Sequence, residues 1–262
     1  MNPVVALLSD FGRRDPYVGM MKMAILEICP GATILDLSHE VEAQGVRQGA
    51  FLLAASLPYL PEGTVVAAVV DPGVGTGRRA LAARIGGRLL VGPDNGLFSW
   101  GWQSVDPRDR AAYELDQDEF WHAPVSDTFH GRDVFAPVAA HLAKGMEIAR
   151  LGSLLDRIKL LPDLDPTPVA EGMRLRIEHI DRFGNLVTNL AAGDVPSDGD
   201  GLKFSVGEAI TVGVRRNYDA AERLIAVVGG LGYLELAAPG GSAAALTGAG
   251  ISDAVIMSSS GD

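Results

Sequence analysis

The stretch Thr-Val-Val-Ala-Ala-Val-Val-Asp-Pro-Gly, residues 64–73, decides the fold class. Thr64–Val70 is almost entirely apolar, and Asp71 then ends the run together with two turn formers. An apolar run without polar alternation is typical of a strand that is buried on both faces, as in parallel sheets covered by helices. We therefore predict a central strand here, with Asp71 at its carboxyl end.

Two earlier segments repeat this pattern, and helical patterns separate the three runs. Val4–Leu8 and Ala32–Leu37 are the apolar runs, and the segments with helical spacing are Tyr17–Ile28 and Gln48–Leu60, which Pro61 ends. Strands that alternate with helices predict an α/β fold: an N-terminal, mainly parallel sheet with flanking helices.

Polar residues follow each of the three runs. They are Ser9-Asp10, Ser38-His39 and Asp71. Ligands of such sheets bind at the carboxyl ends of the strands, so we expect these residues at one edge of the sheet and near a ligand.

The rest of this half contains one more expected strand and one more helix. Arg84–Val91 is expected to be a strand that turns at Gly86-Gly87 and continues. Phe129–Asp133 is expected to be a loop that leads into a helix from about Val134 to Lys144, capped by Gly145.

The pattern changes after a proline-rich stretch, Leu161–Pro168, which is typical of a linker. Beyond it, Arg174–Ile180 and Leu202–Val206 alternate polar and apolar residues, and no helical pattern returns. We therefore predict two domains: residues 1–161 as the α/β domain and residues 168–262 as a smaller, all-β C-terminal domain.

Charge and composition exclude some classes of function. The chain has 262 residues, a formal net charge of −11 and a single cysteine, Cys29, which cannot form an internal disulfide. A phosphate backbone is repelled by such a chain, so nucleic acid is a poor partner.

The N-terminal apolar run lacks the basic region of a signal peptide, and no apolar run approaches the ~20 residues that span a membrane. A cytoplasmic protein is the expectation.

Residues 71–79 contain three glycines, Gly73, Gly75 and Gly77. Backbone N–H groups of such a segment can approach an anion closely. The segment matches neither a phosphate-binding P-loop nor the dinucleotide-binding glycine spacing. From the residues alone, a structural turn and an anion site both remain open.

Three other motifs also have a structural and a functional interpretation. His130 is either a structural histidine or a reactive imidazole before a helix. Asp10 either caps the next helix or accepts hydrogen bonds from a ribose diol. The segment from Asp181 to Asn185 is either a hairpin turn or an amide and an aromatic face that read an adenine edge. The five histidines show no zinc-ligand spacing, so no metal site is predicted.

Taken in order along nearly the whole chain, these motifs resemble the S-adenosylmethionine hydrolases, also called S-adenosylmethionine hydroxide adenosyltransferases, which are related to the fluorinase and chlorinase. The matching stretches are Ser9-Asp10-Phe11-Gly12 with Asp15-x-Tyr17-Val18-Gly19, Asp36-Leu37-Ser38-His39, Val69–Gly75, Gly92–Gly96, Thr128–Asp133, Asp181–Asn185, and Gly232–Glu235 with Gly241–Ala244. Each motif is weak by itself, whereas the ordered set is specific.

The resemblance implies an enzyme that splits S-adenosylmethionine into adenosine and methionine by attack of water on the ribose C5′ carbon. It implies no cofactor and a homotrimer whose sites lie between the N-terminal domain of one subunit and the C-terminal domain of the next. The implied catalytic residues are Asp71, Arg78 and His130, with Arg79 as the alternative arginine. The implied substrate-binding residues are Asp10, Asp15, Phe129, Asp181, Phe183, Asn185 and Tyr218.

Two positions depart from the family pattern, and three alternative functions remain. Gly230 replaces a serine that relatives often carry near the methionine carboxylate, and Ala238-Pro239 replaces a Val/Ala-Asn pair beside the adenine. The alternatives are an S-adenosylmethionine- or adenosine-binding protein or sensor with little turnover, a halide-using transferase, and a purely structural trimer. Halogenases carry aromatic residues at the positions of Asp71 and His130, so these two residues favour water as the nucleophile.

Overall fold

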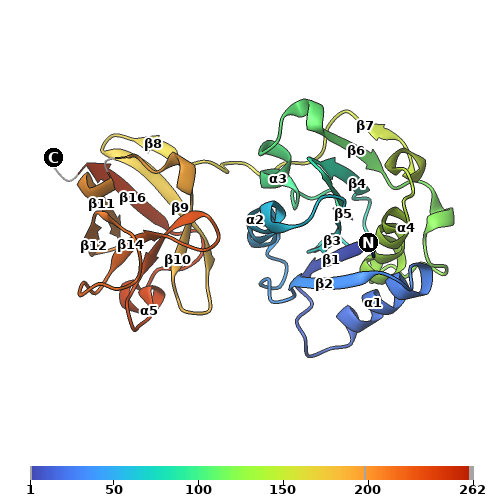
Figure 1. The fold of residues 1–262 in the computed structure, drawn as a ribbon, viewed down its shortest axis with the longest axis horizontal. Helices are drawn as coiled ribbons and strands as arrows, with labels where there is room; N and C mark the ends of the chain where they lie inside the picture. Colours follow the sequence, from blue (N-terminus) through green and yellow to red (C-terminus); the bar gives the residue numbers. More distant parts are fainter. Residues whose placement is uncertain (1, 198, 260–262) are drawn as a thin grey trace. The chain divides into compact units, whose positions relative to one another are not determined.

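The computed structural model describes residues 2–197 and 199–259. The chain divides into two compact units, one ending at Leu161 and the other beginning at Pro162 (Figure 1). The first unit combines a sheet with helices, and the second consists largely of strands.

The N-terminal unit is built on a seven-stranded sheet with the strand order β2-β1-β3-β5-β4-β6-β7. The strands are β1 (Val4–Ser9), β2 (Thr33–Ser38), β3 (Val65–Val69), β4 (Ala80–Ile85), β5 (Arg88–Pro93), β6 (Arg110–Glu114) and β7 (Leu154–Leu155). The half formed by β2, β1, β3 and β5 is parallel. The half formed by β4, β6 and β7 is antiparallel. The α/β class is confirmed, and the sheet is mixed.

Helices cover both faces of this sheet (Figure 1). They are α1 (Tyr17–Ile28), α2 (Val46–Ser56), α3 (Ser99–Gln103) and α4 (Ala136–Ala143), with the short helices η1 (Leu57–Tyr59), η2 (Pro107–Asp109), η3 (Asp118–Phe120), the π-helical η4 (Gly131–Phe135) and η5 (Ile148–Leu151). Side chains of α1 and α4 form one core with every second residue of β1 and β3, including Val5, Leu7, Val65 and Ala67. α2 and α3 pack on the opposite face. Alternate strand residues therefore serve two cores, which explains the uninterrupted apolar runs.

Two sequence predictions for the strands need correction. β2 lies at the edge of the sheet and is not buried on both faces, since Leu35 is 42% exposed. The predicted turn at Gly86-Gly87 is present, but Arg84–Val91 is not one continuing strand, because this turn joins the antiparallel strands β4 and β5. An apolar strand pattern alone cannot distinguish an edge from a centre, or one strand from a hairpin.

The two predicted helices near the N-terminus are present, and the expected loop before α4 is partly helical. α1 has the predicted bounds. The second pattern gives α2 followed by η1. Residues 131–133 belong to the π-helical turn η4, which continues directly into α4. The helix therefore starts one residue after His130.

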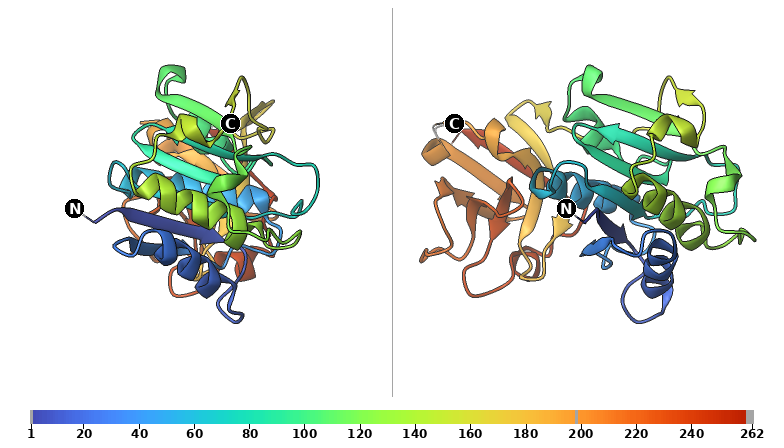
Figure 2. Two further views of the ribbon diagram at one scale, coloured as in Figure 1. Left: turned by 90° about the vertical axis from the view of Figure 1, so that its right-hand side faces the viewer. Right: turned by 45° about the vertical axis from the view of Figure 1, so that its right-hand side comes forward.

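The C-terminal unit forms a nine-stranded, largely antiparallel sheet with the order β12-β11-β16-β9-β10-β15-β14-β13, and β8 pairs with β9. The strands are β8 (Thr167–Val169), β9 (Gly172–Ile180), β10 (Leu186–Ala191), β11 (Leu202–Val206), β12 (Ala209–Val212), β13 (Val214–Arg215), β14 (Ile225–Val228), β15 (Tyr233–Ala237) and β16 (Ala254–Ser259), with the 3-10 turns η6 (Ala192–Asp194) and η7 (Gly199–Gly201). The sheet curls around its own core, and β12 comes close to β14 (Figure 2, yellow to red).

One short helix interrupts the predicted all-β pattern. α5 (Ala243–Thr247) begins after Ser242, whose side chain accepts a hydrogen bond from the Ala245 amide at 3.1 Å. Its end is followed by Gly248 in the left-handed conformation. Five residues are too few to show helical periodicity, but the serine cap and the glycine were visible signals.

No helix within the described residues is both long and apolar enough to cross a membrane.

Candidate active site

Strands β1, β2 and β3 of the N-terminal unit run parallel, so their carboxyl ends meet at one edge of the sheet. Ser9 ends β1, Ser38 ends β2, and Asp71 follows β3 by two residues. The sheet therefore brings Asp10, His39 and Asp71 to the same edge, as the sequence predicts.

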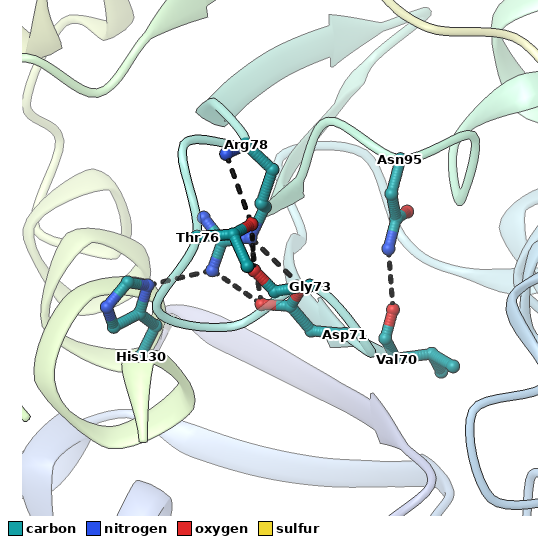
Figure 3. A network of polar contacts seen from close by, with 7 residues as sticks. All are labelled: Val70, Asp71, Gly73, Thr76, Arg78, Asn95 and His130. Atoms are coloured by element: carbon teal, nitrogen blue, oxygen red, sulfur yellow. Dashed lines mark hydrogen bonds and ion pairs between the residues drawn. The ribbon is translucent and has the colours of Figure 1, made fainter. Parts of the chain in front are cut away.

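At this edge, one arginine connects two of the predicted catalytic residues (Figure 3). Arg78 Nε donates to both carboxylate oxygens of Asp71 at 3.0 Å, and Arg78 Nη2 donates to Asp71 Oδ2. The same Nη2 lies 2.8 Å from His130 Nδ1. Arg78 and His130 are 52 positions apart in the chain but belong to one network. Both partners of the Arg78–Asp71 ion pair are largely buried.

The contact with Arg78 determines which nitrogen of His130 carries the proton. A guanidinium group only donates, so His130 Nδ1 accepts, and the neutral imidazole holds its proton on Nε2. Partial burial of His130 and the nearby charge of Arg78 lower its pKa below the ordinary value, although Asp71, Asp133 and Asp127 act in the opposite direction. Near neutral pH, His130 is therefore an uncharged ring that presents an N–H group at Nε2.

The glycine-rich segment after Asp71 is a compact turn. The amide of Val74 donates to Asp71 O at 3.2 Å, and the amide of Thr76 donates to Gly73 O at 3.1 Å. Gly75 has φ +74°, and an added Cβ would lie 2.2 Å from the carbonyl oxygen of Asp127. Only glycine fits both the conformation and this contact. The turn thereby packs against the loop that carries His130.

The neighbouring arginine belongs to a different ion pair. Arg79 Nε donates to Asp94 Oδ2 at 2.9 Å, and Asp94 Oδ1 accepts from the Lys159 amide at 2.7 Å. Arg79 also donates to the backbone of Arg157. The structure thus places Arg78, and not Arg79, with Asp71 and His130.

A buried carboxylate holds the His130 loop in place. Asp133 is fully buried in η4, where it accepts from the Ser126 amide at 2.9 Å and pairs with Arg132. Burial by itself raises the pKa of Asp133. The hydrogen bonds from Arg132 and Ser126 outweigh this effect, so the pKa lies below its ordinary value. π-Helical turns are rare and are often found at functional sites.

Phe129 lies on the same loop and forms a cluster of three rings. Its ring centroid is 5.7 Å from Phe11 and 5.3 Å from Tyr17, both in edge-to-face contact. These rings line a cavity of about 370 Å³ together with Met20, Ser126, Thr128 and Arg132. The cavity offers aromatic faces next to the loop that holds His130.

Asp10 and Asp15 lie in the loop between β1 and α1. Asp10 Oδ2 accepts from the Gln44 amide at 2.8 Å, and Asp15 is exposed. The side chain of Asp10 thus ties two loops together and does not cap α1, for which no side-chain cap is formed.

Buried His39 contacts the same loop through its side chain and its backbone. It bonds Ser9 Oγ at 2.8 Å and Asp36 at 3.1 Å, and its carbonyl accepts from the Gly12 amide at 2.7 Å. With 1% exposure, His39 is a structural residue that supports the Asp10 loop.

The predicted binding residues of the C-terminal unit form a second cluster. Asp181 Oδ1 accepts from the amides of Phe183 and Asn185, both at 2.9 Å, so the segment is a turn. Asn185 Nδ2 donates to Asp181 Oδ2 at 3.0 Å and to Glu235 Oε1 at 3.1 Å. Tyr218 donates to the same Glu235 oxygen at 2.6 Å. The ring of Phe183 is 75% exposed and lies outside this network.

Glu235 is the residue of this cluster that sequence reasoning missed. It lies on β15 between buried leucines and is 3% exposed. Burial raises its pKa, and nearby Asp181 adds to this effect while the bond from Tyr218 lowers it. Burial and the bond to Glu235 raise the pKa of Tyr218 to about 12. A charged residue within the apolar segment Leu234–Ala237 was the available signal.

No group of three or more His, Cys, Asp or Glu that could hold a metal ion occurs in residues 2–197 and 199–259.

Comparisons with known proteins agree along the chain. The profile of the SAM hydroxide adenosyltransferase N-terminal domain matches residues 5–152, and that of the C-terminal domain matches residues 175–256. The "(R)-S-adenosyl-L-methionine hydrolase" of Thermus thermophilus is 43% identical over 93% of this chain and 94% of that protein. A "Fluorinase" of an Actinoplanes species is 30% identical over 77% of this chain and 76% of that protein.

Solved structures share the fold over nearly the whole chain. An uncharacterized conserved protein from Thermotoga maritima superposes with a TM-score of 0.89 at 31% identity, covering 97% of this chain and 99% of that one. A conserved hypothetical protein from Thermus thermophilus gives a TM-score of 0.78 at 40% identity, covering 98% and 100%. Both domain profiles match in order, and the chain therefore belongs to the SAM hydroxide adenosyltransferase family.

Proposed function

We propose that the chain hydrolyses S-adenosylmethionine to adenosine and methionine, with the network of Asp71, Arg78 and His130 holding the attacking water. The network itself is the observation that supports this most strongly, because it places an acceptor and a donor side by side at a ligand-binding sheet edge. Four proteins named (R)-S-adenosyl-L-methionine hydrolase are 34–43% identical to the chain.

The reaction needs a positioned nucleophile more than a strong base. The water oxygen attacks C5′, the C5′–S bond breaks, and its electron pair goes to sulfur, which leaves as the neutral thioether of methionine. Because this leaving group requires no proton, the site must mainly hold water in line with the C–S bond, about 3–3.5 Å from carbon.

In this proposal, each member of the network has a different task. Asp71 accepts a hydrogen bond from the water and then takes its proton. Arg78 holds the Asp71 carboxylate at both oxygens and fixes the tautomer of His130. His130 donates from Nε2 to the water oxygen and stabilises the hydroxide character that develops there. His130 does not accept from the water at Nδ1, since this atom already accepts from Arg78.

The other predicted residues are proposed to hold the substrate. In this proposal Asp10 accepts from the ribose diol, Asp15 and Asp181 attract the methionine amino group, and Phe129, Phe183, Asn185 and Tyr218 surround the ribose and adenine. A Cβ added at Gly230 would meet nothing within 4 Å, so a serine there would fit, as in relatives.

A homotrimer remains part of the proposal, with sites between subunits. The two clusters belong to different compact units, so a substrate that touches both requires the units to meet, in one chain or between chains. Large apolar side chains are also exposed: Tyr59 at 71%, Leu154 at 65% and Met23 at 62%. Burial against other subunits would remove them from water. Sedimentation velocity measures the assembly directly.

The proposed scheme requires no cofactor, and we keep the cytoplasm as the expected location. Activity that survives exhaustive chelation supports a reaction carried by side chains and water. Activity that is lost on chelation and restored by one metal contradicts it.

The deciding experiment incubates the purified chain with S-adenosylmethionine in ¹⁸O-enriched water and follows the products by mass spectrometry. Adenosine with the heavy oxygen at its 5′ position and equimolar methionine are the expected products. Unchanged S-adenosylmethionine bound to the protein would instead support the binding-protein alternative. Chloride- or fluoride-dependent formation of a 5′-halo-5′-deoxyadenosine would support the halide-using alternative.

A further inference from the structure

The scheme above gives no task to Glu235, although this side chain is the centre of the C-terminal cluster. Its neighbours Leu234 and Leu236 are fully buried, and Glu235 itself is 3% exposed. A carboxylate in such a strand is destabilising unless its oxygens accept hydrogen bonds. The bonds that Glu235 accepts therefore indicate what it does.

The carboxylate has one well-defined position. Its Oε1 accepts from Tyr218 Oη at 2.6 Å and from Asn185 Nδ2 at 3.1 Å. On its other side, a Cβ added at Gly229 would lie 2.0 Å from Oε2. The absence of a side chain at Gly229 thus makes room for the carboxylate that receives both donors.

These bonds leave only acceptor atoms for a ligand. Tyr218 has one hydroxyl proton, and Glu235 takes it. Asn185 Nδ2 has two hydrogens, directed to Glu235 Oε1 and Asp181 Oδ2. Because both neighbours of this nitrogen are carboxylates, the amide orientation is set by chemistry, and Asn185 Oδ1 points elsewhere. What remains are oxygen lone pairs, those of Tyr218 and Asn185 and the remaining ones of the Asp181 and Glu235 carboxylates.

We propose that Glu235 is a positioning residue that fixes the hydrogen-bonding polarity of this cluster, so that it accepts from an N–H donor of the ligand. This inference rests on the proposed function only for the choice of ligand. S-adenosylmethionine offers two such N–H donors, the exocyclic amine of adenine and the ammonium of methionine. The rings of Tyr218 and Phe183 are exposed and offer flat apolar surfaces on the same unit.

The test measures equilibrium binding by calorimetry, which does not depend on turnover. One arm compares adenosine with inosine, in which a carbonyl oxygen replaces the amine. The other arm compares L-methionine with 4-(methylthio)butanoate, which lacks the ammonium. A loosened structure weakens the binding of both ligands of a pair to the same extent. A change of hydrogen-bonding polarity instead changes the ratio of their two affinities.

Two substitutions at Glu235 separate polarity from packing. Glu235→Gln keeps an oxygen that accepts from both donors but removes the charge. The adenosine-to-inosine ratio is expected to stay near that of the wild type, and any fall of the methionine ratio measures the loss of charge alone. Glu235→Met fills a similar volume without an acceptor, so the preference for the amine-bearing ligand of one arm should fall about tenfold. The arm that responds identifies the donor. Glu208→Met, at an exposed glutamate of the same unit, is the matched control and should change neither ratio.

A third variant keeps the test valid if Glu235→Met does not fold. Tyr218→Phe removes one acceptor from a half-exposed ring and should lower the same ratio about fivefold. Ratios that stay unchanged in both arms for folded Glu235→Met, or for Tyr218→Phe, overturn the inference. Altered ratios in a protein that does not hydrolyse S-adenosylmethionine would instead reject the proposed function and keep the role of Glu235.

Discussion

The two candidate clusters are organised around opposite charges. In the N-terminal unit, the cation Arg78 lies at the centre and connects Asp71 with His130. In the C-terminal unit, the carboxylates of Asp181 and Glu235 surround the neutral amide of Asn185, and their side-chain partners are amide and phenol groups. The first cluster has balanced charge, whereas the second has an excess of negative charge.

This difference indicates a division of labour. A balanced network can hold a neutral water and stabilise a negative charge that develops on it during the reaction. A cluster with uncompensated carboxylates favours a ligand with positive charge or N–H donors, in the ground state as well as in the transition state. Substitutions in the first cluster should therefore reduce turnover, and those in the second should reduce affinity.

The largest effect is expected for Asp71→Asn, which keeps the shape of the side chain and removes its charge. Turnover should fall about 10²–10⁴-fold, the range for a lost acid–base group, while the Kd for S-adenosylmethionine stays nearly unchanged. Single-turnover kinetics and calorimetry measure the two quantities. Asp94→Asn is the control, since it breaks the Arg79 pair and should lower the Tm without a comparable loss of turnover. Normal turnover of Asp71→Asn would remove Asp71 from the mechanism.

The next effect distinguishes two neighbouring arginines. Arg78→Lys cannot bond both Asp71 oxygens and His130 at once, so kcat should fall about 10–100-fold, as expected for the loss of charge-assisted hydrogen bonds. Arg79→Lys should leave kcat close to that of the wild type, because Arg79 pairs with Asp94. Steady-state assays of both variants suffice. Equal losses in the two variants would mean that the Asp71 network has no special part in the chemistry.

A smaller effect is expected from the second cluster. Asp181→Asn lowers its negative charge and weakens the turn, so KM should rise about tenfold with a much smaller change in kcat. Initial rates over a range of S-adenosylmethionine concentrations separate the two constants. A variant that loses kcat and keeps KM would break the proposed division between the clusters.

The contact between two loops of the first cluster is tested by a glycine pair. Gly75→Ala places a side chain against Asp127 at φ +74°, so the free energy of unfolding should fall by about 1–3 kcal/mol, and turnover should fall as the His130 loop shifts. Gly77→Ala is the control, because its Cβ would meet nothing within 4 Å. Chemical denaturation measures both. Equal stability of the two variants would contradict the close packing at Gly75.

The smallest effect concerns pH. Burial and Arg78 lower the pKa of His130, so kcat/KM should be flat from neutral pH down to the ordinary histidine value of about 6.5 and fall only below it. The folded state binds the His130 proton at lower pH than the unfolded state does. The free energy of unfolding therefore falls as the pH drops below the ordinary histidine pKa and through the lowered pKa of His130. His130→Asn keeps an acceptor for Arg78 and should lose the histidine part of the acidic limb. A wild-type profile that already falls above pH 7 would show that His130 is not held neutral.

Part of the site was predictable because strand ends are visible in the sequence. An apolar run that stops at a charged residue marks the end of a buried strand, so Asp10 and Asp71 could be placed at one sheet edge. The tie between Arg78 and His130 spans 52 positions and arises from the packing of the Gly75 turn on Asp127, which no local pattern encodes. Glu235 was missed because burial, which makes a carboxylate noteworthy, is a property of the folded sheet.

The sequence alone determined the α/β class with a β-rich second half, the bounds of α1, the family, and the ordered set of polar motifs. These follow from local periodicity and from residue types, which a linear chain displays directly. Only the tertiary structure decided that Arg78 rather than Arg79 meets Asp71, that His130 carries its proton on Nε2, and that Glu235 takes the donors of Asn185 and Tyr218. Those outcomes depend on distances between side chains far apart in sequence, because a hydrogen bond exists only when folding brings donor and acceptor to about 3 Å.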